Sequence, residues 1–175
     1  MTVRSLSLVV LMVLGAGAAR ADDLPWKQFE SREGRFVVEF PGAPRPLSSP
    51  RPTAKWGTLE QHLFAVELPS NLVLSVSYID YPKGAIDKDK IDQLLDDART
   101  TVVKLAKGKL ISETKVTMNG FPGRVIVFEG ANNLVFIAHY YLVNGRLYTA
   151  LAYGPKAAPD SAPVKRFFDS FKIKT

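Results

Sequence analysis

The sequence contains no cysteine and only two histidines among its 175 residues. Without cysteine there are no disulfides, no thiolate metal ligands, no cysteine nucleophile and no lipid attachment at a processed N-terminal cysteine. The two histidines, His62 and His139, are far apart in the chain, and neither has a second ligand beside it at metal-binding spacing. We therefore expect no metal or other cofactor, and a fold stabilised by ordinary apolar burial.

Motifs of several enzyme classes are missing as well. The sequence has no Gly-x-Ser-x-Gly motif and no phosphate-binding Gly-x-x-x-x-Gly-Lys-Ser/Thr motif. Residues 87–92 superficially resemble a calcium loop but lack its glycine and its glutamate. These absences favour a protein that is not an enzyme. An enzyme would need a site assembled from distant strands, for which His139 and Asp80 are the candidates.

The N-terminus carries an apolar run that is too short to span a bilayer, which needs about 20 residues. Arg4 precedes the run at residues 6–14, and small residues follow, ending at Ala19-Arg20-Ala21. This pattern is typical of a cleavable secretory signal peptide. We expect removal of residues 1–21 and a single globular domain over residues 22–175, periplasmic or secreted and without a stable membrane anchor.

Charge and aromatic content describe the remaining domain. Loss of Arg4 and Arg20 with the signal leaves 21 basic and 17 acidic side chains, a net charge of +4. This excess is mild and evenly spread, which argues against nucleic acid as a partner. The chain has 2 Trp, 6 Tyr and 10 Phe residues, all beyond the signal, and these can supply a core.

Alternating apolar residues predict strands in the first half of the domain. Phe36, Val38 and Phe40 alternate with their neighbours, and the charged turn at 32–35 makes this strand one arm of a hairpin. Residues 54–68 and 72–81 are predicted to form the next strand pair. The second of these two strands has apolar side chains on both faces, which implies that something packs on each side of the sheet.

Two proline-rich segments, residues 41–53 and 154–163, are predicted to be exposed loops. Residues 41–53 contain five prolines. Proline lacks an amide donor and has a fixed φ, which excludes a helix or a central strand there.

Apolar residues at helical spacing predict a long helix over residues 88–106, with Asp87 as its N-cap and Gly108 at its end. The apolar stripe, which would cover the sheet, comprises Ile91, Leu94, Leu95, Ala98, Val102, Leu105 and Ala106.

From residue 109 the pattern returns to period two. Asn119-Gly120 and Asn144-Gly145 favour tight hairpin turns because both residue types tolerate positive φ. Four antiparallel strands are expected, at 109–118, 121–129, 134–143 and 146–153. A short C-terminal helix is expected to dock by its phenylalanines; its apolar residues are Val164, Phe167, Phe168 and Phe171.

Several short segments resemble PsbP-like domains, the family of the extrinsic lumenal protein of photosystem II. They are Trp26-Lys27-Gln28-Phe29, Gly34-Arg35-Phe36, Phe40-Pro41-Gly42 and the closing Arg166-Phe167-Phe168-Asp169-Ser170-Phe171. The resemblance implies an α+β fold, an α/β/α sandwich around a central antiparallel sheet with one long and one short C-terminal helix. It also implies a binding or accessory role, although many bacterial relatives are lipoproteins and this chain has no cysteine for lipid attachment.

The preferred hypothesis is an exported, non-catalytic binding or accessory domain that uses a surface of its sheet or loops. Its partner would be a protein or a small ligand of the cell envelope. The candidate interaction surface combines tyrosines of the last strands with the basic C-terminal helix: Tyr140, Tyr141, Tyr148, Tyr153, Lys165 and Arg166. An enzyme and a self-associating envelope protein remain as alternatives. A pocket holding His62 or His139 beside a carboxylate would favour chemistry, and an aromatic groove would favour binding.

Overall fold

A computed structural model describes residues 24–53, 55–155 and 160–175. The predicted signal peptide, residues 1–21, lies outside the described residues. Within these ranges no helix combines the length and the apolar character needed to cross a membrane.

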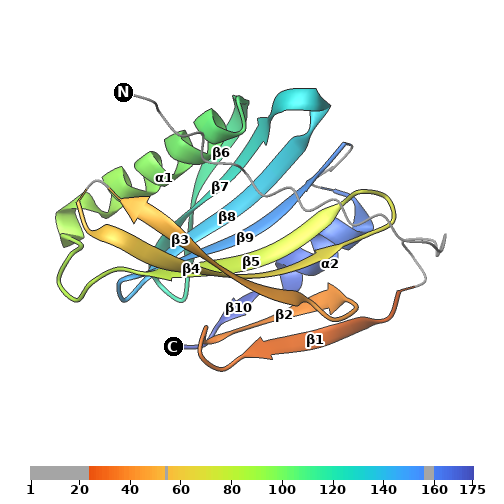
Figure 1. Ribbon diagram of the computed structural model, residues 1–175, viewed down its shortest axis with the longest axis horizontal. Helices are drawn as coiled ribbons and strands as arrows, with labels where there is room; N and C mark the ends of the chain where they lie inside the picture. The colour runs from red at the N-terminus through yellow and green to blue at the C-terminus, as the bar shows by residue number, and fades with distance from the viewer. Residues whose placement is uncertain (1–23, 54, 156–159) are drawn as a thin grey trace.

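The described chain forms two antiparallel sheets (Figure 1). The large sheet has the order β3-β4-β5-β9-β8-β7-β6, and the small sheet has the order β1-β2-β10. The strands are β1 Trp26–Ser31, β2 Phe36–Pro41, β3 Arg45–Thr53, β4 Gly57–Glu67, β5 Val73–Asp80, β6 Lys109–Met118, β7 Phe121–Glu129, β8 Val135–Val143, β9 Arg146–Gly154 and β10 Lys172–Ile173. The four strands expected over residues 109–153 are confirmed, with both Asn-Gly pairs at positive φ in their turns.

The long helix is also confirmed. A short 3-10 turn, η1 Lys88–Lys90, leads directly into α1 Ile91–Leu105. The Asp87 side chain accepts a hydrogen bond from the Asp89 backbone N–H at 3.1 Å, as an N-cap does. Leu95 is fully buried against the large sheet, and most of the predicted apolar stripe packs there. Leu105 was wrongly included in the stripe: it is 47% exposed, and Val103 packs in its place.

The end of α1 differs from the prediction. The residue in the left-handed conformation is Lys107, with φ 49°, and not Gly108. The Gly108 N–H donates to the Val103 carbonyl at 2.8 Å, which closes the helix as in a Schellman motif. Glycine is required at position 108 for another reason: a Cβ there would lie 2.4 Å from the Glu129 carbonyl oxygen.

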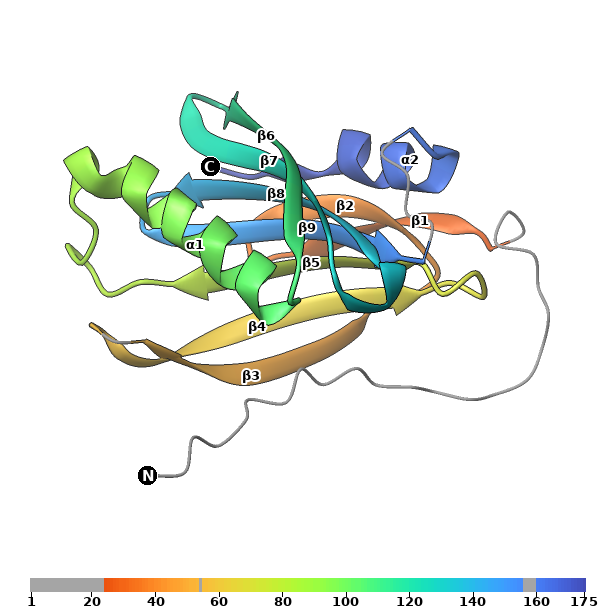
Figure 2. The ribbon, with the colours of Figure 1, turned by 90° about the horizontal axis from the view of Figure 1, so that it is seen from above.

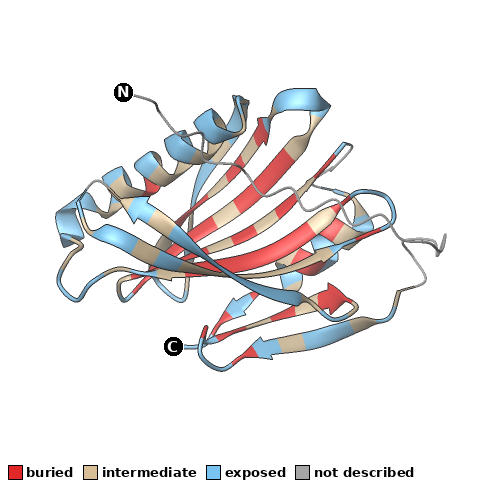
Figure 3. Cartoon of the chain, viewed as in Figure 1, coloured by how far each residue is buried: buried red, intermediate tan, exposed pale blue. Residues whose placement is uncertain are grey.

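The two faces of the large sheet have different covers (Figures 1 and 2). Helix α1 packs on one face, over Ile126 and Phe128 of β7. The other face is covered by the small sheet together with α2 Ala162–Ser170, through residues such as Phe40 and Phe167. The expected α+β sandwich is therefore confirmed, with a small sheet added to one of its helical layers. Figure 3 shows burial concentrated on β5, β9, β8 and β7.

The prediction of a loop over residues 41–53 is wrong, because β3 occupies most of it. Three prolines pair within β3: Pro46 opposite Phe64, Pro50 opposite Glu60, and Pro52 opposite Thr58. Their positions differ by even numbers, so their backbone nitrogens point to the same side of the strand. Since β3 is an edge strand, the positions without an N–H can all face the open edge, where no ladder bond is lost.

Candidate functional site

Residues from five strands form one cross-strand row on the face of the large sheet that carries the small sheet. Register places Ser48 opposite His62, His62 opposite Tyr78, Tyr78 opposite Tyr148, and Tyr148 opposite Tyr141. The His62 and Tyr78 rings stack with centroids 4.7 Å apart and planes 25° apart. The row runs from the exposed edge strand β3 into the core.

The β1–β2 turn is anchored over this row by hydrogen bonds. The Arg146 Nη1 group donates to the Glu33 carbonyl at 2.7 Å, and the Tyr148 hydroxyl donates to the Gly34 carbonyl at 2.8 Å. Within the turn, the Gly34 N–H donates to Ser31 Oγ at 2.9 Å. A Cβ on Gly34 would lie 2.6 Å from that oxygen, so the turn fits the sheet only with glycine there.

Arg146 also holds Asp80 and lies over an aromatic ring. Its Nε and Nη2 groups donate to the two carboxylate oxygens of Asp80, each at 2.6 Å. Its guanidinium carbon lies 4.3 Å from the centre of the Tyr78 ring. The hydrogen bond with Asp80 is the main reason why the pKa of Arg146 is raised, despite its burial. Asp80 is thus committed to an ion pair and is not a free catalytic carboxylate.

An open hollow of about 330 Å³ lies at the outer end of this row. We call it the His62 hollow. Its lining residues are Glu33, Pro46, Leu47, Ser48, His62, Phe64 and Tyr78. Ser48 Oγ lies 3.2 Å from His62 Nδ1. Burial, and next the negative charge of Glu33, raise the pKa of the Tyr78 hydroxyl, which stays neutral at ordinary pH.

The fold of the chain matches a solved structure. The solution structure of cyanobacterial PsbP (CyanoP) from Synechocystis sp. PCC 6803 superposes with a TM-score of 0.59, covering 93% of this chain and 98% of that one. The chain has a PsbP-like fold. Identity is 11%, so the likeness establishes the fold alone. No protein-family model and no curated protein matches the sequence.

The PsbP-like fold buries most of the tyrosines predicted to form an interaction surface. Tyr140, Tyr141 and Tyr148 are at most 6% exposed, and Tyr153 is half-buried. Tyr140 packs in the cluster under α1, whereas Tyr141 and Tyr148 pack in the cluster under the small sheet. The prediction of a shared tyrosine surface is wrong: alternation places neighbouring tyrosines on opposite faces, and both faces are covered.

The two basic residues of the prediction lie on the outer side of α2. Lys165 pairs with Asp169 at 2.8 Å. Arg166 pairs with Glu39 at 2.7 Å, and its guanidinium lies 4.8 Å from the centre of the Trp26 ring. Both side chains are at least half exposed. They are separate from the tyrosines, so the six predicted residues do not form one site.

The second histidine, His139, lies beneath α2 and is not near the His62 hollow. Its ring stacks on Phe168 with centroids 3.9 Å apart and planes 9° apart. Burial lowers the pKa of His139 to about 4, although the charge of Asp169 acts in the opposite direction. His139 is therefore a neutral packing residue at pH 7. The suggested pairing of His139 with Asp80 does not occur, because Asp80 is bound to Arg146.

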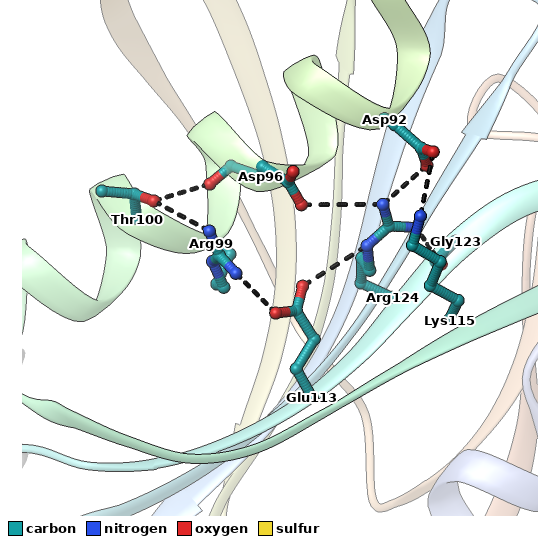
Figure 4. A network of polar contacts seen from close by, with 8 residues as sticks. All are labelled: Asp92, Asp96, Arg99, Thr100, Glu113, Lys115, Gly123 and Arg124. Atoms are coloured by element: carbon teal, nitrogen blue, oxygen red, sulfur yellow. Dashed lines mark hydrogen bonds and ion pairs between the residues drawn. The ribbon is translucent and has the colours of Figure 1, made fainter.

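The most buried charge of the described chain is Arg124 on β7, which no sequence motif marks (Figure 4). It is 2% exposed, and its Nη2 lies 2.6 Å from Asp92 and 3.6 Å from Asp96, both on α1. Its Nε lies 3.3 Å from Glu113 on β6. Arg124 shares its face of β7 with Ile126, two residues on, and that parity was the available signal for burial.

The Arg124 network holds α1 against the sheet. Hydrogen bonds from Arg124 and next Lys115 lower the pKa of Asp92, so the carboxylate stays charged at neutral pH. The Oε1 atom of Glu113 is buried without a hydrogen bond, and the Arg124 charge beside it compensates its own. All these partners of Arg124 belong to the same chain and are already paired with it, which indicates a structural role. Among the described residues no group of three His, Asp or Glu side chains could hold a metal ion.

Proposed function

We propose that this protein is an exported, non-catalytic binding or accessory domain, and that the His62 hollow is its recognition site. One observation carries the proposal. The hollow is lined by both apolar and polar side chains, and its size of about 330 Å³ lies within the usual range of small-ligand sites. Pro46 at its rim is exposed, and Phe64 behind it is partly buried.

The shape of the hollow is fixed by contacts between distant parts of the chain. The β1–β2 turn supplies Glu33, the edge hairpin supplies Leu47 and His62, and β5 supplies Tyr78. Arg146 joins the turn to the sheet. A site built in advance on strands loses little conformational entropy when a ligand binds, and this favours recognition by complementary contact.

One observation favours an enzyme as the second candidate. Ser48 Oγ and His62 Nδ1 are within hydrogen-bond distance, in a hollow that also carries a carboxylate. A serine nucleophile needs a histidine whose other nitrogen is held by an orienting group. In the described part of the chain His62 makes no hydrogen bond other than the one with Ser48. We therefore place binding ahead of hydrolysis; a hydrolytic activity that Ser48→Ala abolished would reverse this order.

Neighbouring serines on β3 provide a matched test. Ser48 faces the hollow, Ser49 points to the opposite side of the strand, and both are exposed. Ser48→Trp should fill the hollow, whereas Ser49→Trp adds the same bulk elsewhere. A photoreactive amino acid at Pro46, which is on the same side of β3 as Ser48, should give an adduct in cells that make the protein, and mass spectrometry identifies the partner.

The same adduct should persist with Ser49→Trp and disappear with Ser48→Trp. Leu105, which is 47% exposed on α1, serves as the control position for the photoreactive group. Equal labelling from positions 46 and 105, or an adduct that survives Ser48→Trp, would show that recognition lies elsewhere.

A further inference from the structure

The protein twice binds one of its own arginines between an aromatic ring and a carboxylate. Arg146 lies 4.3 Å from the centre of the Tyr78 ring and makes two hydrogen bonds of 2.6 Å to Asp80. Arg166 lies 4.8 Å from the centre of the Trp26 ring and 2.7 Å from Glu39. A guanidinium suits both neighbours at once, because its face stacks on the ring while its edge donates to the carboxylate.

The His62 hollow has the same two kinds of group. Arg146 covers the Tyr78 ring and is paired with Asp80, but among the described residues no cation lies over the rings of His62 or Phe64. Glu33 is exposed and lines the hollow beside the rings of His62, Phe64 and Tyr78. Its backbone carbonyl is used by Arg146, but in the described part of the chain its carboxylate has no hydrogen bond and no ion pair.

The negative charge of Glu33 acts on a residue that lines the hollow. It is the second cause, after burial, of the raised pKa of the Tyr78 hydroxyl, so its field reaches the wall of the hollow. The nearest buried cation, Arg146, is already neutralised by Asp80 through two hydrogen bonds. The hollow therefore has a carboxylate without an ion pair among the described residues, the rings of His62 and Phe64, and an apolar rim at Pro46.

We propose that the His62 hollow binds a guanidinium group carried on an apolar stem, as in an arginine side chain. The guanidinium would donate to the Glu33 carboxylate and stack on the His62 ring, with its methylene stem on Pro46 and Phe64. This inference rests on the proposed function, since it names the chemistry that the recognition site selects. The source is either an arginine exposed on a partner protein or a free small guanidinium compound.

The test uses the protein isolated after export from an expression host. Nα-acetyl-arginine amide is titrated against it, and the shifts of the backbone amides of Leu47, Ser48 and His62 are followed by NMR. The dissociation constant is expected to be on the order of 1 mM, as for a single side chain. Nα-acetyl-citrulline amide has nearly the same shape without the charge and should bind at least about tenfold more weakly.

Two charge variants provide the control. Glu33→Gln should weaken binding of the arginine probe by about tenfold or more, whereas Glu67→Gln, which removes an equal charge from an exposed position outside the hollow, should leave it unchanged. Equal binding of the arginine and citrulline probes would overturn the proposal. Equal affinity of wild type and Glu33→Gln would overturn it too.

A peptide arm separates the two sources. Acetylated Ala-Ala-Arg-Ala-Ala amide should bind at least as tightly as the single amino acid if the ligand is a protein segment. It should bind at least about tenfold more weakly if the site accepts only a free small compound. If the arginine probe fails while the adduct at position 46 still depends on Ser48, the ligand class is wrong and the recognition site stands. If that adduct is independent of Ser48, the proposed function itself fails.

Discussion

Mild acid should destabilise this protein through a single side chain, His139. Its ring is packed on Phe168 beneath α2, and burial lowers its pKa from 6.5 to about 4 in the folded state. In the unfolded chain the ring is free in water and takes up its proton near pH 6.5. Between these two values the unfolded state binds more protons than the folded state, so stability falls as the pH falls.

The size of the effect follows from the two pKa values. At pH 7 both states are almost entirely neutral, so the histidine costs nothing. Over the next two pH units the free energy of unfolding should fall by about 2 kcal/mol, since each unit of separation corresponds to about 1.4 kcal/mol. With an m-value of about 2 kcal/mol/M, the urea midpoint should be about 1 M lower at pH 5 than at pH 7.

The assay is urea unfolding followed by tryptophan fluorescence at pH 5, 6 and 7. His139→Phe keeps a ring on Phe168 but cannot be protonated, so its midpoint should change much less over this range. His62→Phe is the matched control, because it removes the other histidine and should retain the full loss. If His139→Phe loses as much stability as the wild type, or if the wild type is more stable at pH 5, the reasoning is refuted.

Two further predictions concern the clamp on α1 and the edge of the sheet. Arg124→Met should lower the free energy of unfolding by about 2 kcal/mol, because the buried Oε1 atom of Glu113 loses the charge beside it, while Arg99 still pairs with the other oxygen. Lys115→Met, an exposed member of the same network, should cost no more than about 1 kcal/mol in the same urea experiment, and equal costs would contradict the clamp. Replacing Pro46, Pro50 and Pro52 together by valine should restore N–H groups along the open edge of β3 and cause self-association, visible as concentration-dependent light scattering. An unchanged monomer at high concentration would show that the prolines do not protect that edge.

Most of the strands and helices could be predicted from local sequence patterns. The four strands from Lys109 to Gly154 could be predicted almost to the residue, because period two and Asn-Gly turns agree there. The strand β3 could not, because proline is read as a sign of a loop unless the strand is known to be at an edge. The pairing of β5 with β9 joins residues as far apart as Val73 and Tyr153, and no local pattern encodes such a pairing.

The candidate site was less predictable than the fold for a related reason. Alternation shows which residues share a face of a strand, but not whether another layer covers that face. Tyr140 and Tyr148 were therefore predicted to be exposed, and both are in the core. Arg124 is the opposite case, a residue that the sequence suggests is exposed but that is buried. A charged residue in a strand is usually exposed, and only the neighbouring carboxylates of α1 and β6 allow its burial.

The His62 hollow depends on the small sheet, which no sequence pattern placed over the large one. Its acidic wall, Glu33, comes from a turn that would be free in an isolated hairpin, since a two-stranded hairpin is marginally stable in water. Arg146 and Tyr148 hold the carbonyls of that turn, and β10 adds a third strand beside β2. Recognition by Glu33 thus requires the complete fold, because the hairpin that carries this residue acquires its position only when the chain from β9 to β10 is in place.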